Sequence, residues 1–143
     1  MALIYRVMTN QDGRPKLGPT RRTLGVKARP GEESNAVDIP TDFRGIVRPN
    51  TGGMSVAPSW RDLPRHRIPA RLRHLLPSAC GRNEDACWRM GDGPFQDAPV
   101  ASGLRLRVTS KTHGVVEPAM AVPLDRYQAD LAATQNEWVI DER

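Results

Sequence analysis

The sequence predicts an α+β fold over residues 1–143 that is rich in strands and loops and has few, short helices. Two observations lead to this prediction. Thirteen prolines and twelve glycines are spread along the chain, which prevents long helices through most of it and favours short strands joined by ordered loops. Hydrophobic residues make up 38% and aromatic residues 5% of the chain, so we expect a modest core. A chain of 143 residues can still bury such a core as a single domain without metal or disulfide staples.

The first strand is expected at Leu3–Met8, with Ile4, Arg6 and Met8 on one face. Both faces of this segment are mostly apolar, which indicates a central strand. An unpaired guanidinium is costly to bury there, because it loses its hydration without replacement. Arg6 must therefore meet an anion or a buried carboxylate, for which Asp38 is a candidate.

The middle of the chain is expected to be irregular. Residues 14–42 show no clear periodicity and are predicted to form an ordered loop anchored by Leu24, Val26 and Ile39. Two short strands, Gly45–Arg48 and Met54–Val56, are expected around the turn at residues 49–53. Two helical turns are expected at Ala70–Leu76, between Pro69 and Pro77.

The second half is more regular. Leu104, Leu106 and Val108 alternate with polar residues, as in a strand with one wet face. Val115 and Val116 predict a further strand, which Pro118 limits to an edge or an end. A helix is expected to begin at Pro123 and to stop at residues 134–136, before a last strand at residues 138–140. Its apolar stripe is Leu124, Tyr127 and Leu131.

The net charge of +5 is unevenly distributed. Residues 61–74 contain five arginines and two histidines against one acidic residue, Asp62. Such a run is a solvated surface, or it binds a dinucleotide phosphate, a nucleic acid or an acidic protein. Trp60 and Trp88 flank the run without interleaving it, so nucleic acid is the less favoured partner.

Several classes of protein are not expected. The N-terminus has no secretory signal pattern and no segment is apolar enough to span a membrane, which predicts a cytoplasmic protein without membrane association. Two cysteines, Cys80 and Cys87, are too few for a disulfide framework, and free thiols are the expected state in a cytoplasm. With His66 and His74 they match no common zinc spacing, so we expect no metal. Neither a phosphate-binding loop nor a Gly-x-Ser-x-Gly elbow is present.

Three segments together resemble a known family. They are the opening strand through Arg6, the stretch Pro49–Val56 with its Thr-Gly-Gly and Ser-Val, and Thr112-His113 followed in register by Pro118-Ala119, Pro123, Tyr127 and Leu131. This combination is similar to the ADP-ribosyltransferase-like cytotoxins exported by type VI secretion, the Tse-type NAD-dependent effectors. Residues 61–103 match poorly, and Glu117 stands where a family member has an apolar residue.

The resemblance implies a fold and a function. The fold is a split pair of small antiparallel sheets with NAD in the cleft between them. The activity is that of an antibacterial toxin that acts in the cytoplasm of a target cell, by ADP-ribosyl transfer or NAD glycohydrolysis. Because a producing cell must block such a toxin, a small acidic immunity protein is the expected partner, with the arginines of residues 61–74 as its docking surface.

The resemblance also implies the roles of site residues. Arg6 would clamp the NAD phosphates, since a guanidinium can bind phosphate oxygens bidentately. Ser55, after a glycine turn that lets backbone approach the ligand, would hold Arg6 or the nicotinamide ribose, and Glu117 or His113 would contact the ribose hydroxyl of the developing cation. The residues expected to bind NAD are Arg6, Gly52, Gly53, Ser55 and Thr112.

Each of these residues also has a purely structural explanation. Arg6 could pair with Asp38, Ser55 could satisfy a backbone group, and Glu117 could be a solvated strand end. The alternative function is a non-catalytic basic module that docks an acidic protein or a nucleic acid through residues 61–74. The enzyme hypothesis requires Arg6, Ser55 and Glu117 to converge in one cleft.

Overall fold

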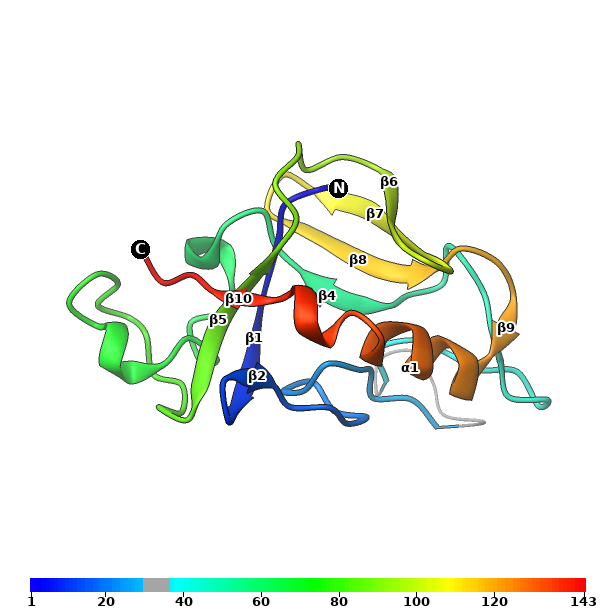
Figure 1. Ribbon diagram of the computed structural model, residues 1–143, viewed down its shortest axis with the longest axis horizontal. Coiled ribbons are helices and arrows are strands. Elements are labelled where there is room, and N and C mark those ends of the chain that lie inside the picture. The colour runs from blue at the N-terminus through cyan, green and yellow to red at the C-terminus, as the bar shows by residue number, and fades with distance from the viewer. Residues whose placement is uncertain (30–36) are drawn as a thin grey trace.

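The computed structural model describes residues 1–29 and 37–143, and these residues form an α+β fold built mainly from antiparallel strands (Figure 1). The predicted strand-rich, helix-poor class is confirmed. One four-stranded sheet has the order β10–β5–β1–β2 and another the order β4–β8–β7–β6, while β3 and β9 form a separate pair. The predicted loop at residues 14–42 falls partly outside the described residues, but its anchors Leu24, Val26 and Ile39 are all buried.

The strands of the first sheet are β1 (Ile4–Gln11), β2 (Arg14–Pro15), β5 (Asp85–Met90) and β10 (Val139–Ile140). As predicted, β1 is an inner strand, and it is buried on both faces from Ile4 to Met8. It continues to Gln11 and reverses through Asp12 and Gly13, whose positive φ angles of 55° and 85° form the tight turn into β2.

Strand β5 was not predicted, although it provides the main partner of β1. The two strands pair antiparallel from Ile4 opposite Met90 to Thr9 opposite Asp85. Trp88 lies opposite Arg6, and its indole N–H donates to the carbonyl of Met8 over 2.9 Å. The sequence gives little sign of β5, because a strand that is buried on both faces lacks the alternation of apolar and polar residues that marks a half-exposed strand. The residues on either side of it are also polar.

The second sheet contains β4 (Met54–Val56), β6 (Ala98–Ala101), β7 (Leu104–Ser110) and β8 (His113–Pro118). Leu106 lies opposite Val116, which itself lies opposite Met54, and all three side chains are in the core. The same register places Ser55 and Glu117 on the other face. Pro118 ends β8, which is an inner strand of this sheet.

The two sheets meet at a corner where β1 touches the end of β4. The amide of Tyr5 donates to the carbonyl of Ala57 over 2.8 Å, and the amide of Ala57 donates back to Tyr5 over 3.0 Å. Beyond this point the chain forms a short 3₁₀ helix, Trp60–Asp62, with Ser59 as its N-cap. The corner therefore brings β1, β4 and the following turn together, and the candidate site lies there.

The helix α1 (Leu124–Ala132) packs its buried Tyr127 and Leu131 against this core (Figure 1). Pro123 is the N-cap of the helix, which therefore begins at Leu124, one residue after the predicted start. The hydroxyl of Tyr127 donates to the carbonyl of Val116 over 2.5 Å and accepts the amide of Met54 over 3.1 Å. These two bonds fix the helix to β4 and β8 at once.

The remaining elements are short. Strands β3 (Ile46–Val47) and β9 (Val122–Pro123) pair with each other, and the predicted turns at Ala70–Leu76 include a 3₁₀ helix at Ala70–Leu72. A third 3₁₀ helix covers Gln135–Glu137. Within residues 1–29 and 37–143, no helix is long and apolar enough to cross a membrane.

Candidate functional site

A cavity of about 250 Å³ opens at the corner between the two sheets. Val7, Val56, Ala57 and Leu63 provide apolar walls. The polar side chains of the lining come from segments far apart in the sequence: Arg6, Arg21, Asp38, Ser55, Asp62, Arg67, Thr112 and His113. Three arginines against two carboxylates make the cavity positive on balance, which suits an anionic ligand.

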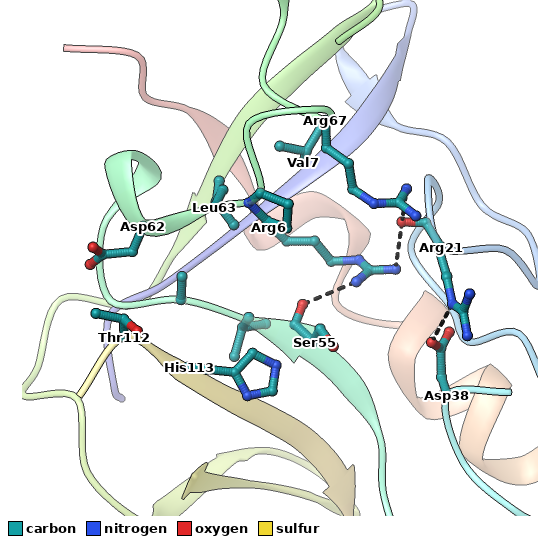
Figure 2. A pocket seen from close by; sticks show the side chains of 13 residues that line it. Arg6, Val7, Arg21, Asp38, Ser55, Asp62, Leu63, Arg67, Thr112 and His113 are labelled. Carbon is teal, nitrogen blue, oxygen red and sulfur yellow. Dashed lines mark hydrogen bonds and ion pairs between the residues drawn. The ribbon is translucent and has the colours of Figure 1, made fainter. Parts of the chain in front are cut away.

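Four of the predicted site residues line this cavity: Arg6, Ser55, Thr112 and His113. Figure 2 shows Ser55 between the guanidinium of Arg6 and the imidazole of His113. The other three predicted residues, Gly52, Gly53 and Glu117, are not part of the lining. The expected convergence of Arg6, Ser55 and Glu117 is therefore found for the first two only, and the enzyme hypothesis in the form that relies on Glu117 is wrong.

Arg6 is held by backbone carbonyls. Its side chain is buried with the residue 5% exposed, and its guanidinium donates to the carbonyls of Thr20, Arg21, Thr23, Gly25 and Ser55 over 3.0–3.4 Å. No carboxylate of the described residues pairs with it, so the suggested ion pair with Asp38 is not formed. Arg6 instead fastens the loop after β2 to β1 and β4.

The guanidinium of Arg6 remains a cation with one donor to spare. Burial lowers its pKa to about 10, partly offset by the negative charge of Asp38, so it is still protonated at neutral pH. Its Nη1 carries two hydrogens and has one acceptor among the described residues, the carbonyl of Ser55. Because Arg6 also lines the cavity, its positive charge contributes to the attraction of an anionic ligand there.

The two glycines before β4 allow close packing of backbone segments. A Cβ on Gly52 would collide with the carbonyl of Asp38, and one on Gly53 would lie 2.6 Å from the carbonyl of Val116. The amide of Gly53 also donates to the Asp38 carbonyl over 3.0 Å. The glycines thus allow close approach of other backbone segments and not of a ligand. One of these segments contains Asp38, whose side chain lines the cavity.

Asp38 and two arginines form the cationic side of the cavity (Figure 2). The Asp38 carboxylate accepts from Arg21 over 2.9 Å and from the amide of Lys27 over 2.7 Å. Arg67 donates to the carbonyl of Arg21 over 3.3 Å. Burial lowers the pKa of Arg67, and repulsion from the nearby charges of Arg21 and Arg22 lowers it further, while Asp38 and Asp85 partly offset both. A bound anion would relieve that repulsion.

His113 is oriented by Thr109. The Thr109 hydroxyl donates to the carbonyl of His113 over 3.1 Å and lies 2.5 Å from its Nδ1. Because a hydroxyl has a single hydrogen, we assign the proton of the ring to Nδ1, which leaves Nε2 as an acceptor. Burial, helped by the charge of Arg107, lowers the pKa of His113, so the ring is neutral at pH 7 and can accept a proton.

Asp62 provides a carboxylate that the sequence interpretation did not assign to the site. It follows Ser59, whose hydroxyl accepts the amide of Arg61 and begins the short 3₁₀ helix. Within the described part of the chain its carboxylate forms no hydrogen bond or ion pair, unlike that of Asp38. It is placed with Thr112 across the cavity from Arg21 and Asp38 (Figure 2).

Glu117 occupies a different place. Its side chain is fully buried, and its carboxylate accepts from Arg105 over 2.6 Å, Arg107 over 2.8 Å and the amide of Asn50 over 3.0 Å. Burial alone would raise its pKa, but the bonds from Arg107, Asn50 and Arg105 outweigh burial and lower it. Glu117 is thus an ionised group that joins β7, β8 and the turn before β4, and not a solvated strand end.

The arginines at residues 61–74 are largely engaged within the molecule. Arg61 stacks on Trp60, Arg71 forms a bidentate pair with Glu142, and Arg73 donates to the carbonyl of Ala79. Arg67 lines the cavity. The C-terminal residues lie over part of this run, and the Trp60 indole donates to the carbonyl of Arg143 over 2.6 Å. Less of this surface is therefore free for a partner than its composition suggests.

The cysteines and histidines do not assemble into a metal site among residues 1–29 and 37–143, where no group of three or more His, Cys, Asp or Glu side chains has metal-binding geometry. Cys80 is exposed and Cys87 is buried, and both are free thiols. Burial raises the pKa of Cys87 to about 12, which makes it unreactive.

No protein-family model matches this chain, and no curated protein matches it in sequence.

Proposed function

We propose that the cavity binds NAD and cleaves its nicotinamide glycosidic bond, as an ADP-ribosyltransferase-like toxin does. The observation that carries this proposal is the gathering of Arg6, Ser55, Thr112 and His113 at one positively charged cavity. These residues come from three separate segments of the chain. They are also residues for which the resemblance to the Tse-type effectors implies a role.

The charges of the cavity suit the pyrophosphate of NAD. Arg21 and Arg67 present guanidinium groups at its cationic side, and the guanidinium of Arg6 lies beside them (Figure 2). Planar guanidinium groups bind phosphate oxygens through paired hydrogen bonds. Ligand pockets usually measure about 300–1,000 Å³, so this smaller cavity would enclose the nicotinamide riboside half, with the pyrophosphate at its edge against Arg21 and Arg67 and the adenosine outside.

The proposed reaction breaks the bond between ribose C1′ and the nicotinamide nitrogen. The bonding electrons leave with nicotinamide, which becomes neutral, while positive charge develops on the ribose. Asp62 is the carboxylate that would stabilise this charge, in place of Glu117. An acceptor hydroxyl, amine or water forms the new bond to C1′ and gives its proton to Nε2 of His113.

The biological proposal follows from the reaction. An enzyme that consumes NAD or modifies cytoplasmic targets is toxic to the cell that contains it. An acidic immunity protein that covers the cavity would protect the producing cell, and its approach to the arginines around the cavity would be fast and sensitive to salt.

Release of nicotinamide from NAD by the purified protein tests the activity. We expect His113→Ala to lower the rate by roughly a hundredfold or more, because a positioned general base commonly contributes that much. His66→Ala is the matched control, since His66 is an exposed histidine that does not line the cavity. Equal rates for wild type and His113→Ala, with both proteins folded, would contradict the proposed role. No release above the rate without protein would contradict the function itself.

A further inference from the structure

A second basic depression adjoins the cavity. It measures about 540 Å³, is lined mainly by the loop that follows β2, and shares Arg21 and Arg67 with the cavity. Lys16, Arg22 and Lys27 add three further cations, and no carboxylate of residues 1–29 or 37–143 lines it. We call this depression the basic groove.

The cations of the basic groove differ in how far they are neutralised. Arg21 pairs with Asp38, and Arg22 forms a bidentate pair with Asp85 over 2.9 and 3.0 Å. The ammonium groups of Lys16 and Lys27 have no hydrogen bond or ion pair with any described residue, and Arg67 donates only to a carbonyl. Three cations in the groove, Lys16, Lys27 and Arg67, are thus without a carboxylate partner in the part of the chain that the structure describes.

The charge exceeds what one NAD molecule could neutralise. Its pyrophosphate carries two negative charges, whereas Lys16, Lys27 and Arg67 are three cations without a carboxylate partner among the described residues, since Arg21 is paired with Asp38. The groove therefore fits a ligand that carries a series of negative charges.

The lining favours a nucleic acid strand over an acidic protein. Among the described residues its apolar lining consists of Leu17, Gly18 and Pro19, which form no deep apolar pocket for the anchoring side chains on which protein partners depend. Lysine and arginine side chains are groups that contact phosphates in nucleic acids, and the groove offers Lys16, Lys27 and Arg67 for this. None of the described residues of the lining is aromatic, which favours contact with the backbone of the strand over stacking with its bases.

We propose that the basic groove binds the phosphodiester backbone of a single nucleic acid strand, without regard to sequence. The strand would run past the mouth of the cavity, where Arg21 and Arg67 lie between the two sites. This binding does not depend on NAD cleavage, so failure of the proposed enzymatic activity would leave it standing.

Fluorescence anisotropy of a short labelled oligothymidylate, measured over a range of salt concentrations, tests the groove. Three phosphate contacts predict that the logarithm of the binding constant falls with the logarithm of salt with a slope of about −2 for a single strand. Lys16→Gln/Lys27→Gln should reduce this slope to about −0.7, because one contact remains. Arg44→Gln/Arg126→Gln removes the same charge from exposed positions outside the groove and should leave the slope unchanged.

Four results would overturn the inference. They are no binding at low salt, an equal loss of slope in both double variants, displacement of the strand in proportion to NAD occupancy, and equally tight binding of polyglutamate. The third would make the groove part of the dinucleotide site, and the fourth would assign it to an acidic protein.

Discussion

Arg6→Met is expected to lower the free energy of unfolding by about 3–5 kcal/mol, because it removes a buried cation from the carbonyls that surround it. Methionine fills a similar volume but donates no hydrogen bond. The loop after β2 would then lose its fastening to β1 and β4. A domain of this kind has a total stability of about 5–15 kcal/mol, so the variant should be close to unfolding.

Urea denaturation followed by tryptophan fluorescence measures this change, since Trp88 lies opposite Arg6 on β5. Arg67→Met is the control, because Arg67 lines the same cavity but is only partly buried and forms one hydrogen bond. We expect it to cost about 1 kcal/mol or less. Equal destabilisation by both variants would show that the carbonyls around Arg6 find other donors.

Glu117→Gln should lower the stability at neutral pH by about 2–3 kcal/mol, because charge-assisted bonds from Arg105 and Arg107 are lost. The pKa of Glu117 is lower in the folded protein than its ordinary value of 4.5. Its contribution to stability is therefore complete above that value and is lost as the pH falls through the lower, folded-state pKa. The wild type should lose stability in this acidic range more steeply than the variant.

Melting temperatures of both proteins from pH 7 downward test this prediction. Glu137→Gln is the control, because Glu137 is exposed and should not alter the acid profile. Parallel profiles for the wild type and Glu117→Gln would refute the role of Glu117 as a buried ion-pair partner. Since Glu117 does not line the cavity, nicotinamide release by the folded fraction of Glu117→Gln should stay near that of the wild type.

The regular elements of the fold follow from local patterns. Alternation predicts β7, and the spacing of Tyr127 and Leu131 after a proline predicts α1. The strand β5 escapes such a reading because its residues are buried on both faces between acidic loops. The strand β6 is short and contains Pro99, which argues against a strand until its partner β7 is known.

The site was predictable only in part, because its geometry depends on pairing between distant segments. The cost of burying an arginine shows that Arg6 needs partners, but the partners are carbonyls of a loop whose path is set by tertiary contacts. The alternation in β7 predicts that Arg105 faces solvent, but it does not show that Arg105 lies opposite Glu117 on the neighbouring strand β8. Asp62 was visible only as the exception in a basic run, and its position at the cavity follows from the turn after β4.

The central claim is that the cavity between the two sheets binds NAD, and calorimetric titration with carba-NAD, whose glycosidic bond cannot be cleaved, tests it most directly. We predict one binding site in the wild type. Arg67→Gln should lower the affinity roughly tenfold or more, because a phosphate contact is lost. Arg126→Gln changes an exposed arginine outside the cavity and should leave the affinity unchanged. Absence of binding by the folded wild-type protein, or equal affinity in both variants, would contradict the account.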